Sequence, residues 1–134
     1  MDKLEYIPGD FVSVYVGVKK YIVEVIGTEN ENEVLSYQIK FPNGEIQYAD
    51  KDNIVPIPLT PEILQKNGWE PTKESLGHSF KNKKYPRFAL WSINDKWNIT
   101  IDGVMVCNTL SCLCYVYELQ HLLFGLGLNS DMEV

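Results

Sequence analysis

The chain has 134 residues, of which 45% are hydrophobic and 22% charged. This composition is typical of a folded globular protein and excludes an intrinsically disordered one. The longest purely apolar runs span only a few residues, which excludes a membrane-spanning helix. The net charge of −6 counts against general nucleic-acid binding, because phosphate groups repel an acidic protein at long range.

The first 57 residues predict five short strands, with turns every 8–12 residues. Pro42-Asn43-Gly44 is the clearest turn, in which Asn-Gly supplies the positive φ values of a two-residue hairpin. A polar, acidic hairpin tip is expected at "GTENENE" (27–33). Five short strands at this spacing predict a small barrel or a strongly bent sheet. The strands are expected at 11–16, 21–28, 35–41, 45–49 and 53–57.

The order of these segments, "PGDF…VEVI…YQIKFPNGEIQYAD…NIVPI", resembles the SH3-like barrels of Tudor and KOW type. The resemblance covers about 50 residues. It implies a fold and no particular activity.

A short helix is predicted within "IPLTPEILQKNGWE" (57–70). Thr60 is a suitable N-cap, Pro61 occupies the first helical position, and Gly68 ends the helix in the left-handed conformation. Trp69 is then placed to fold back onto Leu64. A helix of about two turns cannot stand alone and must pack on another element.

After a polar loop at 71–77, the segments "RFALWSIN", "KWNITI" and "VMVCN" predict a three-stranded antiparallel meander. Its turns are expected at 94–95 and at Asp102-Gly103. Residues 113–127 have helical spacing and should pack a leucine face across the meander. Gln120 falls within that apolar face, so we expect its amide to bond the backbone of the meander or of the 108–111 loop.

The predicted fold class is therefore α+β. An SH3-like small β-barrel subdomain at 1–57 precedes a helix–meander–helix subdomain at 58–134. The first carries ten acids against five lysines, and the second carries eight acids against seven bases. The negative charge is thus concentrated in the first subdomain.

"PLTPEIL…NGW" and "YVYELQHLLF" together resemble a group of small bacterial proteins of prophage or mobile-element type. The resemblance implies a shared fold with a β-rich start, and it carries over no catalytic residue. The chain departs from the group's pattern at two positions. Tyr117 stands where His is expected, and His121 stands where Asn is expected.

All three cysteines lie close together, at Cys107, Cys112 and Cys114, and His121 follows. The C-x4-C-x-C-x6-H spacing matches no paired zinc knuckle, although Cys114 and His121 would lie two turns apart on one helix face. Buried or half-exposed reduced thiols are the favoured interpretation over zinc or redox chemistry. The prediction is no metal and no cofactor.

The segment "HSFKNKKYPR" (78–87) interleaves bases with aromatic residues, as single-strand and RNA surfaces do. The alternative is a solvated loop whose lysines balance an acidic surface. Possible nucleic-acid contacts are Lys81, Lys83, Lys84, Tyr85 and Arg87.

Tyrosines of the first half form a possible aromatic surface at Tyr15, Tyr21 and Tyr48. Tudor-type barrels use such rings as cages for methylated cations. A barrel this small also needs aromatic residues to fill its own interior, and Tyr37 is expected there.

No glycine-rich phosphate loop, HExxH or GxSxG motif is present, so we predict that the protein is not an enzyme. The favoured function is that of an accessory protein that binds an unknown protein partner or a second copy of itself. The alternative is a nucleic-acid-binding module that uses the 78–87 loop. With no signal-peptide pattern at the start of the sequence, we expect a cytoplasmic location and no membrane partner.

Overall fold

The computed structural model describes residues 6–31, 34–73, 78–93, 96–105 and 113–134, and the statements below concern these residues. The chain divides into two compact units. Unit 1 comprises Met1–Ile57, Tyr115–Met132 and Val134, and unit 2 comprises Pro58–Cys114 and Glu133. The boundary between Ile57 and Pro58 coincides with the predicted one, but most of the last twenty residues belong to unit 1.

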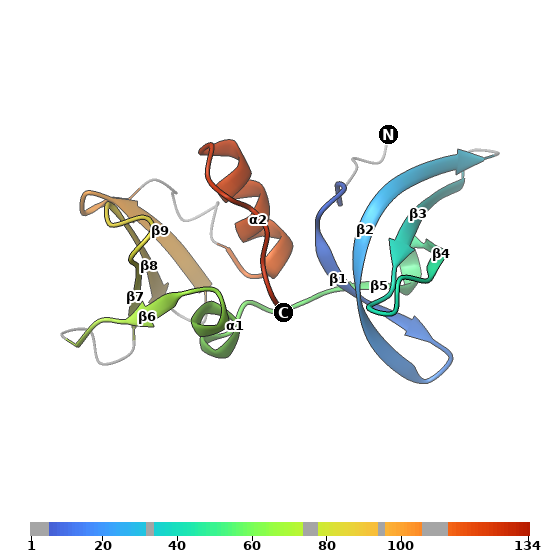
Figure 1. The fold of residues 1–134 in the computed structure, drawn as a ribbon, viewed down its shortest axis with the longest axis horizontal. Helices are drawn as coiled ribbons and strands as arrows, with labels where there is room; N and C mark the ends of the chain where they lie inside the picture. The colour runs from blue at the N-terminus through green and yellow to red at the C-terminus, as the bar shows by residue number, and fades with distance from the viewer. Residues whose placement is uncertain (1–5, 32–33, 74–77, 94–95, 106–112) are drawn as a thin grey trace. The chain divides into compact units, whose positions relative to one another are not determined.

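Unit 1 contains a five-stranded antiparallel sheet in the order β4-β3-β2-β1-β5. All five strands predicted from the sequence are confirmed. A 3-10 turn, η1 (Lys51–Asn53), connects the last two strands. The sheet curves strongly (Figure 1), yet among the described residues it does not close, because β4 and β5 are its two edge strands. The strands are β1 (Phe11–Val16), β2 (Lys19–Glu31), β3 (Val34–Lys40), β4 (Ile46–Asp50) and β5 (Ile54–Pro56).

The core of unit 1 follows from the two-residue period of its strands. Val12 and Val14 on β1 face Val23 and Val25 on β2 across one side of the sheet, and all four are at most 2% exposed. Tyr37 is also buried, at 1% exposure, and contacts Tyr6 edge to face. The expectation that Tyr37 fills the interior is confirmed. A bulge between Val25 and Gly27 shifts the β2–β3 register and bends the strand, as bulges do.

The hairpin between β3 and β4 differs from the predicted two-residue turn. Gly44 has φ +90°, but Asn43 is not among the positive-φ residues of the described chain. The Gly44 N–H donates to the Phe41 carbonyl, and the Phe41 N–H donates to the Glu45 carbonyl. Pro42 locks its own φ near −65°, which suits a type I turn followed by a left-handed glycine. The loop is therefore three residues long.

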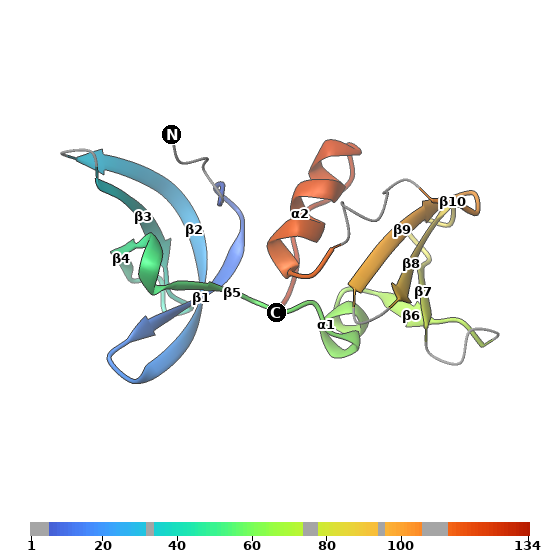
Figure 2. The same cartoon turned by 180° about the vertical axis from the view of Figure 1, so that it is seen from behind.

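Unit 2 contains a second antiparallel sheet in the order β10-β9-β8-β7-β6, seen from behind in Figure 2. The predicted meander is confirmed, and its Asp102-Gly103 turn has the positive φ values of 52° and 83°. Two strands that were not predicted precede the meander. The strands are β6 (Trp69–Pro71), β7 (Ser79–Asn82), β8 (Phe88–Ile93), β9 (Lys96–Ile101) and β10 (Val104–Met105).

Helix α1 (Pro61–Lys66) forms as the sequence predicts. Thr60 Oγ1 accepts a hydrogen bond from the Ile63 N–H at 3.3 Å, and Pro61 occupies the first turn. Gly68 ends the helix with φ +86°. Leu64 and Trp69, at 0% and 2% exposure, are both in the core of unit 2.

Helix α2 (Val116–Gly125) starts later than predicted, because Tyr115 is its N-cap and Cys114 lies before it. The Tyr115 N–H donates to Glu118 Oε1 at 3.1 Å. The leucine face is confirmed at its centre, where Leu119 and Leu123 are buried. The helix belongs to unit 1, whereas the predicted helix–meander–helix subdomain at 58–134 grouped it with the meander; unit 2 contains α1 and the meander without α2.

Within the described residues, no helix is long and apolar enough to cross a membrane.

Candidate functional site

Unit 1 has a pocket of about 360 Å³ at the open seam of its sheet. Strand β1 pairs with β5 only over Val12–Val14, so Tyr15 and Val16 lie beyond that pairing. Strand β4 is the edge strand on the other side. The pocket lies between these two regions and is lined by Val14, Tyr15, Val16, Ser36, Ile39, Gln47, Tyr48, Ala49, Asp50 and Asn53.

The chemistry of this seam pocket is aromatic and acidic. Tyr15 and Tyr48 are 45% and 59% exposed, so their rings are available to a ligand. Asp50 and Asn53 supply oxygen acceptors, and none of the lining residues is Lys, Arg or His. Aromatic faces next to a carboxylate attract organic cations.

Tyr21, the third member of the predicted aromatic surface, does not line the seam pocket. Its ring packs edge to face on Phe41, with centroids 5.8 Å apart. The structure therefore brings Tyr15 and Tyr48 together and places Tyr21 elsewhere.

Charge and exposed apolar surface both accumulate on unit 1. Its sequence carries twelve acids against five lysines, a net charge of −7, whereas unit 2 carries six acids against seven bases, a net charge of +1. Among the described residues, ten of the exposed large hydrophobic side chains belong to unit 1, and two, Trp91 and Val104, belong to unit 2. Among the described residues, unit 1 therefore carries both the negative charge and most of the exposed large apolar side chains.

A buried polar cluster joins α2 to the start of β1 within unit 1. Gln120, 2% exposed, donates to the Gly9 and Ser130 carbonyls at 2.8 and 3.2 Å and accepts the Phe11 N–H at 2.9 Å. The expectation that this amide is buried and bonded to backbone is confirmed. Its partners differ from the predicted meander and 108–111 loop, because the helix packs in unit 1.

Beside Gln120, His121 Nε2 lies 2.7 Å from Asp10 Oδ2. The same oxygen accepts the Ile7 N–H at 2.9 Å. Burial is the largest influence on Asp10 and raises its pKa, against the lowering effects of the Ile7 hydrogen bond and of His121. With Asp10 2% exposed, this pair anchors α2 at the start of β1. We assign it a structural role.

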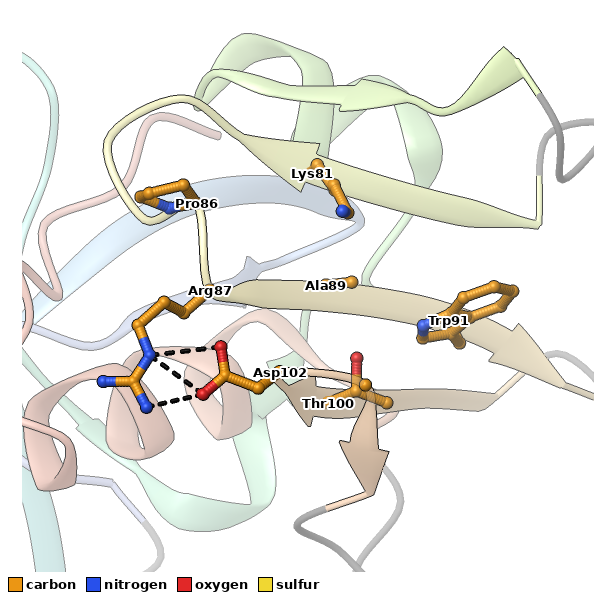
Figure 3. A pocket seen from close by; sticks show the side chains of 8 residues that line it. Lys81, Pro86, Arg87, Ala89, Trp91, Thr100 and Asp102 are labelled. Atoms are coloured by element: carbon orange, nitrogen blue, oxygen red, sulfur yellow. Dashed lines mark hydrogen bonds and ion pairs between the residues drawn. The ribbon is translucent and has the colours of Figure 1, made fainter.

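Unit 2 has a larger hollow, of about 550 Å³, on one face of its sheet. Figure 3 shows Lys81 on β7 directed toward Ala89 on β8, with Trp91 at one end and Arg87 at the other. Lys81 pairs with Ala89, and Ala89 pairs with Thr100, so these three form one row across the sheet. The small side chains of Ala89 and Thr100 make a low floor beneath Lys81.

The Arg87 end of the hollow is closed by an ion pair. Arg87 Nη2 donates to Asp102 Oδ2 at 2.6 Å, and Nε donates to Oδ2 at 3.0 Å and to Oδ1 at 3.2 Å. Both groups are exposed, and hydrogen bonding to Arg87 lowers the pKa of Asp102. The guanidinium charge is thus largely committed to Asp102.

A second hollow, of about 340 Å³, adjoins the first and shares Lys81 and Pro86 with it. Lys83 and Glu70 also line this hollow. We call the two hollows together the sheet groove, since they share lining residues on the same sheet.

The predicted basic–aromatic segment contributes Lys81, Lys83 and Arg87 to the lining of the two hollows, but none of its rings, and Lys84 lines neither hollow. Lys81, Lys83 and Lys84 are exposed. Phe80 is buried at 2% exposure, because it points to the opposite side of β7. Tyr85 is half-buried and packs between Trp69 and Phe88, with ring centroids 6.4 Å from each.

The exposed ring of the sheet groove is Trp91, which the sequence analysis did not single out. A usable signal was present in the sequence. Phe88 and Leu90 share the core face of β8, so alternation places Ala89 and Trp91 on the other face. Trp91 is 38% exposed, whereas Trp69 and Trp97 are 2% and 4% exposed.

The cysteine cluster is only partly described, because Cys107 and Cys112 lie outside the described residues. Cys114 is half-buried, and its carbonyl accepts the Leu59 N–H at 2.9 Å. Since α2 begins at Val116, the predicted helix face shared by Cys114 and His121 does not exist. Among the described residues, no group of three His, Cys, Asp or Glu side chains could hold a metal ion.

Comparison with known proteins finds no family model, no curated protein and no solved structure that matches the chain. The resemblance of its two sequence motifs to the small prophage-type proteins therefore stays a prediction.

Proposed function

We propose that the protein is a non-enzymatic accessory protein whose unit 1 binds a basic segment of a partner protein. The observation that carries the proposal is the seam pocket, which combines two exposed tyrosines with a carboxylate. A lysine or arginine side chain fits this chemistry, because its charge pairs with Asp50 while its stem and head lie against Tyr15 and Tyr48.

The net charge of −7 on unit 1 supports the same partner class, since it attracts basic segments and repels acidic ones. Val16, which is 50% exposed and lines the pocket, adds apolar surface that a bound segment would cover. The proposal includes a partly open barrel of the SH3-like class for unit 1 and a cytoplasmic location, where the cysteines stay reduced.

Fluorescence anisotropy with labelled synthetic peptides tests this function. The probe is a peptide of about ten residues that alternates lysine and valine, and its control has glutamate in place of lysine. We expect only the lysine peptide to bind. Tyr48→Ser should weaken binding by roughly 2- to 30-fold, as expected for loss of a cation–aromatic contact of about 0.5–2 kcal/mol. Asp50→Asn should also weaken binding, because it removes the carboxylate that pairs with the lysine charge.

Ile46→Ser is the matched control, because Ile46 is 51% exposed on the same strand but does not line the pocket. Equal binding of the two peptides, or equal loss in all three variants, would contradict the proposal. Sedimentation of the protein alone tests whether the partner is a second copy of the chain. A dimer that dissociates in the Tyr48→Ser variant would identify self-association.

A further inference from the structure

We infer that the sheet groove of unit 2 is a binding site for single-stranded nucleic acid, with Trp91 stacking on a base and Lys81 contacting phosphate. This site is separate from the seam pocket, and the inference does not depend on the function proposed for unit 1.

The shape of the groove is the first argument. Ala89 and Thr100 form its floor, and neither carries a bulky side chain, so a flat ring can lie on the sheet. Trp91 lies two residues from Ala89 on the same face of β8, a separation of about 7 Å along the strand. A nucleotide could therefore stack its base on Trp91 and direct its phosphate toward Lys81 (Figure 3).

The charge of the groove is the second argument. Lys81 lines both hollows, Lys83 lines the second, and neither forms an ion pair within the part of the chain that the structure describes. The lining of the two hollows holds three bases, Lys81, Lys83 and Arg87, against two acids. Of these acids, Asp102 is paired with Arg87, and Glu70 lies opposite Lys81 on the neighbouring strand. With unit 2 at +1, this face attracts a polyanion although the whole chain is acidic.

The exposed indole decides between two kinds of polyanionic ligand. An acidic peptide would need only the lysines, whereas base stacking requires an accessible aromatic face. Trp91 provides that face at the end of a small-residue floor. Single strands are favoured over a duplex because their bases are free to stack on a side chain.

The experiment measures binding of a fluorescein-labelled oligonucleotide of about twelve nucleotides, as DNA and as RNA, to the full chain at several salt concentrations. Two phosphate contacts, from Lys81 and Lys83, predict a slope of log affinity against log salt of about −1.4. Lys81→Gln should reduce the slope to about −0.7. Lys66→Gln, an exposed lysine on α1 that lines neither hollow, is the matched control and should leave the slope unchanged.

A gain-of-function variant comes from the ion pair. Asp102→Asn releases the Arg87 guanidinium at the end of the groove, so affinity should rise and the slope should steepen to about −2.1. Asparagine suits this position, because Asp102 has φ +52° and asparagine tolerates the left-handed conformation. The variant should therefore fold normally.

Tryptophan emission locates the contact independently. The other two tryptophans are buried, so quenching on titration with unlabelled oligonucleotide reports Trp91. Trp91→Ala should abolish the quenching and weaken binding by roughly 5- to 100-fold, the range for loss of one stacked base. Trp91→Phe should retain part of the affinity.

Three results would overturn the inference. The first is that the oligonucleotide does not bind at low salt. The second is that it binds with an affinity that none of the groove variants changes. The third is tighter binding of a glutamate-rich peptide than of the oligonucleotide, which would identify the groove as a site for acidic peptides.

Discussion

Gln120 ties three separate segments of unit 1 together, and its replacement by leucine tests that role. Its side chain bonds the backbone at Gly9, Phe11 and Ser130. Leucine has nearly the same size, so Gln120→Leu removes the three hydrogen bonds without leaving a large cavity. We expect the variant to fold with a less stable unit 1.

The magnitude follows from the groups left behind. An unsatisfied buried polar group costs about 1–3 kcal/mol, and the Phe11 N–H would lose its acceptor entirely. Gly9 and Ser130 are only half-buried, so water can reach their carbonyls. Loss of the two hydrogen bonds to these carbonyls therefore adds only about 1 kcal/mol. The extra buried apolar surface of leucine returns roughly the same amount. The net expectation is a loss of about 2 kcal/mol, or about 30-fold in the unfolding equilibrium.

Hydrogen exchange is the appropriate assay because it resolves the two units. The amides of Val12, Val14 and Val23 lie in the core strands of unit 1 and should exchange about 30-fold faster in the variant. Tryptophan fluorescence follows unit 2 separately, because all three tryptophans lie there.

The matched control is Phe124→Leu, a change on the same helix at a side chain that is 69% exposed. It should alter stability by less than about 0.5 kcal/mol. A Gln120→Leu protein as stable as the wild type within that margin would refute the reasoning, since it would mean that the three hydrogen bonds contribute nothing net.

Three further predictions concern single residues. Burial raises the pKa of Asp10 above 3.8, so its contribution to the free energy of unfolding is complete below pH 3.8 and is lost as the pH rises through the raised native pKa. Asp10→Asn should lack this decline. Urea titrations from about pH 3 to about pH 7 in which the wild type and the variant show parallel pH dependence would contradict the prediction. Thr60→Ala should destabilise unit 2 by about 1 kcal/mol through loss of the α1 N-cap, measured by tryptophan fluorescence, with Thr60→Ser close to wild type. Gly68→Ala should lower the stability by about 1–2 kcal/mol, because φ is +86° and the new Cβ would lie 3.3 Å from Asn82 Nδ2. Gly125→Ala is its control in thermal unfolding, because a Cβ at that position would have no atom within 4 Å. Equal effects of the two changes would argue against backbone strain.

Local signals in the sequence predicted the elements that depend on neighbouring residues. Alternation placed the five strands of unit 1, and Thr60, Pro61 and Gly68 placed α1 with its end. Such elements depend only on a two-residue or 3.6-residue period and on a capping residue, and both can be recognised from residues that are close together in the sequence. The β6 and β7 strands were missed because each holds a single large apolar side chain, Trp69 or Phe80, so neither shows an apolar alternation.

The candidate sites required contacts between residues far apart in the chain. The pairing of β1 with β5 and the edge position of β4 bring Tyr15 next to Asp50. The Arg87–Asp102 pair arises from a turn on the neighbouring strand. No local pattern encodes such pairings.

The sequence by itself determined the strand and helix segments, the acidic character of the first 57 residues and the burial of Gln120. Only the tertiary structure decided that α2 joins unit 1, because the helical pattern does not select a partner until the polar side chains of the helix find hydrogen-bond partners in distant segments. Gln120 and His121 make that selection through Gly9, Phe11 and Asp10, since a buried polar group must find its hydrogen-bond partner.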